Sequence, residues 1–179
     1  MDTLQQYRAV MASCRETYLK KVIDYGTSWR VLRSISIVDQ IYIKAWRVRS
    51  IQENGGSQQI ADSIESEFAG MVNYGLIALI QMTLGDGHET ELSADEAGRL
   101  YAQQAAAVEQ LMLQKNHDYG EAWREMSQES FVDLILTKLL RIKQILANDG
   151  KTLISEGIDA NFSDIVNYAV FALIKIRYA

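Results

Sequence analysis

One short stretch of the sequence combines an acid with two basic residues at helical spacing. On a helix, Lys138 and Arg141 are neighbours, and Asp133 lies on roughly the same side. Two positive side chains so placed repel each other unless an anion lies between them. One interpretation is that Lys138 and Arg141 hold phosphate oxygens while Asp133 helps to hold a metal ion. The simpler one is a solvated face with a salt bridge to another segment.

A second set of polar residues, Glu156, Asp159, Asp164 and Asn167, lies near the C-terminus. In a helix that advances about 100° per residue, Glu156, Asp159 and Asn167 share one face. Apolar residues flank Asn167, so we expect it to be buried with a hydrogen-bonding partner. Clustered carboxylates are costly unless a cation neutralises them, and Mg²⁺ with oxygen ligands is the common solution. The set predicts a magnesium site, with exposed acids and a structural asparagine as the alternative.

The third set is the pattern Lys115-x-x-Asp118-Tyr119-Gly120-x-x-Trp123. Glycine commonly ends a helix, so Asp118 would lie at a helix C-terminus, where the helix dipole disfavours negative charge. We therefore expect Asp118 to meet a cation, either a metal ion or an arginine. The alternative for Gly120 and Trp123 is structural: the glycine ends the helix and the tryptophan packs the loop onto the core.

All three sets occur twice, because the sequence is a tandem duplication. A shift of 94 residues aligns positions 21–80 with 115–174 without a gap, and more than a third of the aligned residues are identical. Polar residues contribute little to a core and exchange freely on a surface, so those that both copies keep mark candidate site residues. Their counterparts in the first copy are Lys21, Asp24, Tyr25, Trp29, Asp39, Lys44, Arg47, Asp62, Glu65 and Asn73.

These residues must be positioned by helices, since the chain has no proline and most of its glycines lie at segment ends. We expect three helices in each copy, at about 3–25, 35–54 and from 57–60 to 84, then at 94–119, 131–148 and 153–178. Apolar residues at helical spacing, Ile60 and Ile154 among them, should form the buried stripe. The predicted fold is all-α: a first repeat at 1–84, a linker at 85–92 and a second repeat at 93–179, packed as one pseudo-two-fold bundle.

The composition argues against several classes of protein. With 179 residues, 48% hydrophobic and 23% charged, the chain is typical of a globular domain. A formal charge of −5 argues against broad nucleic-acid binding, although a small anionic ligand is still allowed. The apolar stretches are too short to span a membrane and the N-terminus lacks a secretory signal, so we expect a cytoplasmic protein. The single cysteine, Cys14, should be a small buried hydrophobe.

In their order along the chain, the three sets resemble the nucleotide modification associated domain 1 family. Its helical pattern is Lys-x-x-Asp-Tyr-Gly-x-x-Trp, a Lys-x-x-Arg helix and an acidic helix ending in Asp-x-x-Asn-Tyr, found here at 115–123, 138–141 and 156–168 and again in the first copy. The acid before Asn-Tyr is Asp164 in the second copy but Gly70 in the first. If one copy alone is active, the second is therefore the better candidate.

That family is similar in turn to the MazG-like nucleoside triphosphate pyrophosphohydrolases, which hold Mg²⁺ with two acidic pairs. The resemblance implies a Mg²⁺-dependent enzyme that hydrolyses nucleotides, and it implies three groups of residues. Metal ligands would be Glu156, Asp159 and Asp164, with Asp62 and Glu65 in the first copy. Catalysis would involve Asp118, Asp133, Lys138 and Arg141, and nucleotide binding Lys115, Tyr119, Trp123, Asn167, Lys44, Arg47 and Asn73.

Two other functions are compatible with the same residues. One is a non-catalytic nucleotide-binding or regulatory module, linked to nucleic-acid modification, and the other is a purely structural pseudo-dimer. For the enzyme and for the nucleotide-binding module, the partner is a nucleotide or another small phosphorylated ligand. The sequence does not name its base or sugar, and a homo-oligomer is also compatible with it.

Overall fold

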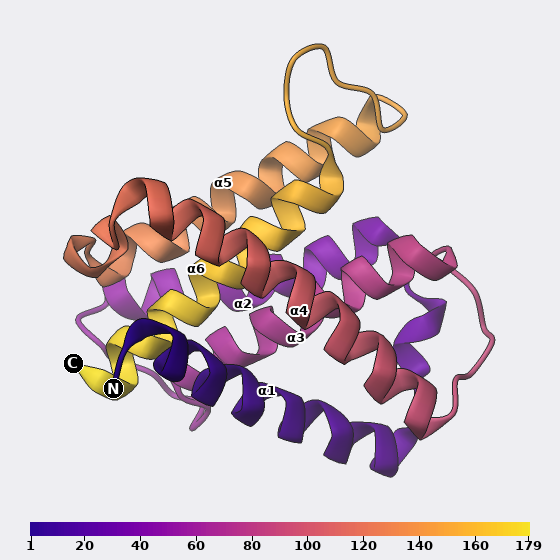
Figure 1. Ribbon diagram of the computed structural model, residues 1–179, viewed down its shortest axis with the longest axis horizontal. Helices are drawn as coiled ribbons and strands as arrows, with labels where there is room; N and C mark the ends of the chain where they lie inside the picture. The colour runs from indigo at the N-terminus through magenta and orange to yellow at the C-terminus, as the bar shows by residue number, and fades with distance from the viewer.

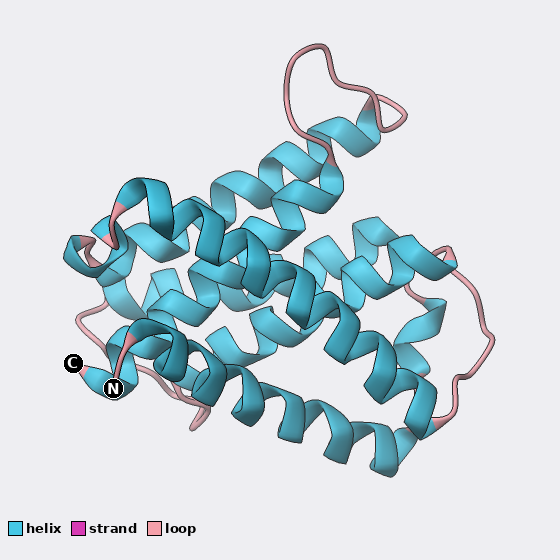
Figure 2. Ribbon diagram, viewed as in Figure 1, coloured by secondary structure: helices cyan, strands magenta, loops and turns pink.

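The computed structural model describes residues 1–179, which form helices and loops without any strand (Figures 1 and 2). Each repeat has three long helices and a short 3₁₀ turn, and both the all-α class and the tandem pair of three-helix repeats are confirmed. The elements are α1 Thr3–Tyr25, η1 Ser28–Val31, α2 Ser34–Glu53 and α3 Ile64–Leu84, then α4 Ala94–Tyr119, η2 Ala122–Glu125, α5 Gln128–Ala147 and α6 Ile158–Tyr178. None of these helices has the combination of length and hydropathy that a membrane span requires.

The third helix of each repeat begins later than predicted. α3 starts at Ile64 and α6 at Ile158, and the residues before them form loops. In the first repeat Ser63 is the cap, because its hydroxyl accepts a hydrogen bond from the amide of Ser66. A polar, glycine-containing segment thus connects the second and third helices, where helical periodicity does not apply.

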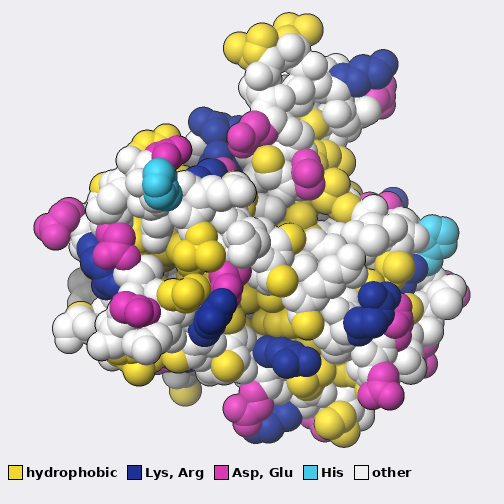
Figure 3. Space-filling model, viewed as in Figure 1, with side chains coloured by type: hydrophobic (Ala, Val, Ile, Leu, Met, Phe, Trp, Pro, Cys, Tyr) yellow, Lys and Arg dark blue, Asp and Glu magenta, His cyan; other side chains and the backbone are white.

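Two consequences of these later helix starts correct the sequence analysis. The side chains of Ile60 and Ile154 are exposed and lie outside the buried stripe. Asp62 and Glu156 precede their helices, so neither shares a helix face with the following acid and asparagine, and that prediction is wrong. The loop between α5 and α6 projects from the molecule (Figure 1) and exposes apolar side chains at its tip (Figure 3).

The two repeats share one core. A single hydrophobic cluster contains buried side chains from all six helices, and the most extensive helix contact joins α3 of the first repeat to α6 of the second. At this crossing the backbones approach closely at Gly75, where an added Cβ would lie 2.6 Å from a methyl carbon of Val166. A larger residue there would force the two helices apart.

Buried hydrogen bonds are exchanged between the repeats in pairs. The hydroxyl of Tyr7 donates to Oδ1 of Asn167 over 2.7 Å, and the equivalent Tyr101 donates to Asn73 over 2.8 Å. Each asparagine amide also donates to a backbone carbonyl in the first helix of its own repeat. The prediction that both asparagines are buried with partners is confirmed.

The two aspartates of the Asp-x-x-x-x-Lys-x-x-Arg sets also form exchanged pairs. Asp39 forms an ion pair with Lys143 at 3.0 Å, and the equivalent Asp133 accepts a hydrogen bond from Arg49 at 3.4 Å. These contacts join α2 to α5 across the pseudo-two-fold axis. They correspond to the simpler of the two interpretations, a salt bridge to another segment.

The linker at 85–92 packs on the loop that follows α1. The guanidinium of Arg30 donates to the carbonyl oxygens of Gly85 and Thr90, and the amide of Leu92 donates to the hydroxyl of Thr27 over 2.9 Å. The connection between repeats is therefore fixed to the first one.

Cys14 is buried, as predicted, and its thiol should be unreactive in the folded protein. Burial raises the pKa of this thiol to about 12, whereas an exposed cysteine ionises near pH 8.5. We expect no reaction with an aromatic disulfide reagent at pH 8, and complete reaction once urea unfolds the chain. Because the unfolded thiol ionises first, this group should lower stability as the pH rises from about 8.5 to about 12. Rapid labelling of the native protein would contradict the assignment.

Candidate functional site

A cavity of about 810 Å³ lies in the first repeat, among α1, η1, α2 and α3, and the end of α6 reaches it from the second repeat. Its size is in the usual range for small-molecule sites. Five serine and threonine side chains line it, which are Ser13, Thr17, Ser28, Ser63 and Ser66. The cavity therefore combines room for a ligand with many small hydrogen-bonding groups.

Aromatic side chains form a large part of the cavity lining. Tyr18, Tyr25, Trp29 and Tyr74 all contribute, and the rings of Tyr18 and Trp29 lie 6.4 Å apart between centroids. Trp29 is buried, and its indole Nε1 has no hydrogen-bonding partner in the protein. Such rings suit a flat, unsaturated ligand.

Three cations reach the cavity from three different helices: Lys21 from α1, Lys44 from α2 and Arg177 from α6. Lys21 is exposed and forms no ion pair. The ammonium of Lys44 lies 3.6 Å from a carboxylate oxygen of Glu67. Arg177 contacts Glu65 at 2.6 Å.

Glu67 is a central charged residue that the sequence analysis missed. It is buried and lies 3.1 Å from Arg47 as well as beside Lys44. The anion expected between these two cations is thus the protein's own carboxylate. Gly70, one helical turn later, leaves the space that the Lys44 side chain fills, since an added Cβ would lie 2.9 Å from its Cε.

In the second repeat the buried acid lies one turn later in its helix. Asp164, the counterpart of Gly70, contacts Lys115 at 2.6 Å and Lys138 at 2.9 Å. Burial disfavours the charge of Lys115, but the hydrogen bond to Asp164 and the negative charge of Asp164 raise the pKa of Lys115 above its usual value. Asn161, the counterpart of Glu67, turns back to donate to the carbonyl of Gly157. Glu67 could have been found from the sequence, because positions 67 and 70 lie on one side of the helix and the second repeat has its acid, Asp164, at the counterpart of 70.

The counterparts of the first-repeat cavity residues are differently engaged in the second repeat. The two lysines that correspond to Lys21 and Lys44, Lys115 and Lys138, are bound to Asp164. Trp123 is stacked on Phe171, with ring centroids 4.3 Å apart and planes 5° from parallel. Tyr119 is exposed. Larger side chains also replace small ones, as where Leu111 corresponds to Thr17.

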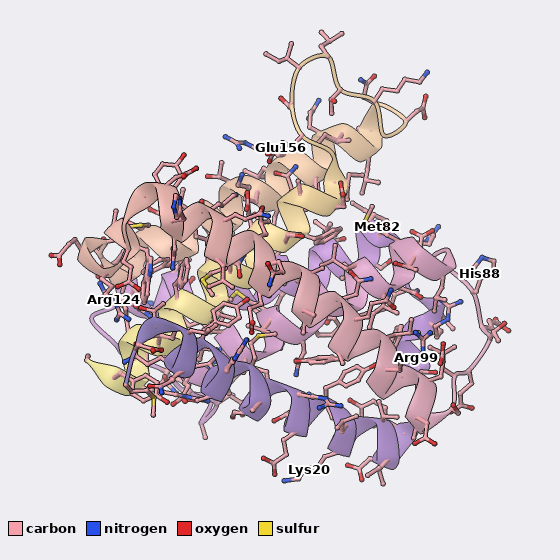
Figure 4. All side chains as sticks on the ribbon, in the orientation of Figure 1. Lys20, Met82, His88, Arg99, Arg124 and Glu156 are labelled. Carbon is pink, nitrogen blue, oxygen red and sulfur yellow. The ribbon has the colours of Figure 1, made fainter.

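The acids predicted as metal ligands or catalytic groups are not gathered by the fold. Glu156 and Asp159 are exposed, and Figure 4 shows Glu156 on the projecting connection between α5 and α6. Asp118 is exposed and meets only its neighbour His117. No three side chains of Asp, Glu, His and Cys stand close enough to hold a metal ion.

The remaining predicted site residues are placed as follows. Asp24 is exposed, and no arginine or lysine of the chain forms an ion pair with it. Arg141 is exposed, while Asp133 is paired across the repeats. Asp62, Glu65, Lys44 and Asn73 line the cavity of the first repeat. Arg47 does not line the cavity and is bound to Glu67 and to backbone carbonyls of the loop before α3. Asn167 accepts a hydrogen bond from the exchanged Tyr7.

The comparison with known families matches both repeats. The model of a family described as nucleotide modification associated domain 1 covers residues 21–82 and again 115–176. No curated protein and no solved structure matches the chain. Each match runs from the lysine near the end of the first helix of its repeat to the last turns of the third. Because the two matches together cover more than half of its length, the chain belongs to the nucleotide modification associated domain 1 family, as a tandem pair of its helical units.

Proposed function

We propose that the protein binds one nucleotide in the cavity of the first repeat. The observation that carries this proposal is the combination, in one cavity of about 810 Å³, of four aromatic side chains with Lys21, a cation that forms no ion pair. A nucleotide joins a flat base to an anionic phosphate and needs both. The family description, which links these domains to nucleotide modification, agrees with this choice.

The lining offers a partner for each part of the ligand. The base would lie against the rings of Tyr25, Trp29 and Tyr74, as bases do on aromatic platforms. Lys21 and Lys44 would contact the phosphate. Asp62, an acid in the lining that forms no ion pair, would accept hydrogen bonds from sugar hydroxyls.

The residues present do not fit the magnesium site that the resemblance implies. Of the three acids in the lining, Glu65 is bound to Arg177 and Glu67 to Arg47, which leaves Asp62 as the acid without an ion pair. In the second repeat two lysines already neutralise Asp164. The geometry therefore favours binding over turnover. Magnesium, pyrophosphohydrolase activity and the similarity to MazG-like enzymes stay predictions.

Replacing Lys21 by alanine is expected to weaken nucleotide binding about tenfold, because the phosphate loses a charged hydrogen-bond donor. The measurement is calorimetric titration with the common nucleoside mono-, di- and triphosphates, in ribo and deoxy forms, with and without Mg²⁺. Chromatography of the same mixtures for monophosphate and pyrophosphate tests hydrolysis.

Two lysines serve as controls for this titration. Lys20→Ala removes a neighbouring lysine that does not line the cavity, is exposed and pairs with Glu16. This variant should bind normally. Lys115→Ala removes the counterpart of Lys21 in the second repeat. If Lys115→Ala weakens binding and Lys21→Ala does not, the ligand lies in the second repeat and the proposal is wrong.

A further inference from the structure

The cavity of the first repeat contains one guanidinium that belongs to the second repeat. Arg177, in the last turn of α6, donates through Nε to Glu65 over 2.6 Å and through Nη2 to the hydroxyl of Ser13 over 3.3 Å. Its remaining N–H donors have no partner in the protein. The site is thus built from both halves of the chain.

We infer that Arg177 recognises the phosphate of the bound nucleotide and makes the site select nucleotides over nucleosides. This inference rests on the proposed function. A guanidinium presents paired N–H donors that match two oxygens of one phosphate, which an ammonium does not. Lys21 and Lys44 approach the same cavity from other helices, so the three cations can surround a single anionic group.

Glu65 is the competitor of the phosphate for this arginine. Its side chain is 39% exposed, so its carboxylate can turn into solvent when a phosphate oxygen takes its place on the guanidinium. The ion pair keeps Arg177 extended into the cavity. An incoming anion must bind Arg177 more strongly than Glu65 does in order to displace it. A neutral ligand gains nothing from this exchange, and that difference provides the selectivity.

The duplication supports an assignment to the first repeat alone. The residue of the first repeat that corresponds to Arg177 is Thr83, so the first repeat has no equivalent arginine to contribute to the second. Lys115 and Lys138, the counterparts of Lys21 and Lys44, are both bound to Asp164. One selective site per chain follows.

A purely structural role for the ion pair is the competing explanation, and the chain contains a matched example. Arg8 and Glu109 also join the two repeats, with Nη2 and Oε1 2.7 Å apart, yet neither lines the cavity. Arg8→Met and Glu109→Gln therefore control for the loss of an inter-repeat tie.

The test measures the affinities of each nucleoside 5′-monophosphate and of its nucleoside by calorimetry, for the full chain and its variants. Wild-type protein should bind the preferred monophosphate at least about tenfold more tightly than its nucleoside. Arg177→Met should remove most of that ratio while leaving nucleoside affinity unchanged, and Arg177→Lys should restore part of it. Glu65→Gln should raise monophosphate affinity several-fold, and the Arg8 and Glu109 variants should change neither ligand.

The outcomes separate this inference from the proposed function. If wild-type protein binds neither nucleosides nor nucleotides, the proposed function fails. If it binds nucleotides but Arg177→Met keeps the full ratio, with folding verified by circular dichroism, Arg177 is only an inter-repeat tie and the inference is overturned.

Discussion

Replacing Asp164 by alanine is expected to lower the free energy of unfolding by about 3 kcal/mol, because it leaves a partly buried lysine without its counter-ion. Asp164 and Lys138 expose 7% and 13% of their side chains and lie 2.9 Å apart. Lys115 is more exposed and can turn into solvent, so most of the loss should come from Lys138. Urea denaturation followed by circular dichroism measures the change.

The sign of this change distinguishes a salt bridge from a metal site. In a metal site without its ion, the clustered carboxylates repel one another. Removing one of them relieves this repulsion and stabilises the protein. Here we expect destabilisation, and the double variant Asp164→Leu/Lys138→Met should recover much of it, because an apolar pair avoids the cost of burying charge. A more stable Asp164→Ala protein in the presence of a chelator would support the metal site instead.

Removing the exchanged tyrosine hydroxyls should have the second large effect. Tyr7→Phe and Tyr101→Phe each leave an asparagine oxygen buried without its donor, at a cost of about 1.5 kcal/mol each. The double variant should lose about 3 kcal/mol by the same estimate. Both losses weaken the contact between the repeats, since each bond joins one repeat to the other.

Tyr18→Phe is the matched control for these substitutions. Tyr18 is also buried in α1, but its hydroxyl donates to the carbonyl of Ala97, which lies inside helix α4 and already accepts a backbone hydrogen bond. Its loss should therefore cost less than that of Tyr7 or Tyr101. If all three single variants lose the same stability, the exchanged bonds have no special role.

The helices and the buried asparagines were predictable because local signals determine them. The absence of proline, glycines such as Gly120 at helix ends, and the capping serine Ser93 indicate where helices begin and end. Asn73 and Asn167 lie among apolar neighbours in both repeats, so burial followed directly. Their partners were not predictable, because Tyr7 and Tyr101 lie far away in the sequence and in the other repeat.

The charges of the site were predicted less well, for a physical reason. Comparing the repeats position by position hides an acid that moves by one helical turn, so Gly70 suggested a lost acid although Glu67 supplies it. Exposed acids such as Asp159 were predicted to be metal ligands because a sequence pattern does not show whether side chains converge. Arg177 has no basic counterpart in the first repeat and reaches its position only through the crossing of the helices.

The exchanged tyrosine–asparagine bonds also bear on the protein's ancestry. A single unit on its own would bury an asparagine without its hydrogen-bonding partner, because the tyrosine that donates to it lies in the other copy. This arrangement implies an ancestor that folded as a homodimer. In a homodimer every mutation appears in both subunits, so neither subunit can specialise. Within one chain the two copies can differ, and here the first has an open cavity where the second has a lysine–aspartate–lysine cluster.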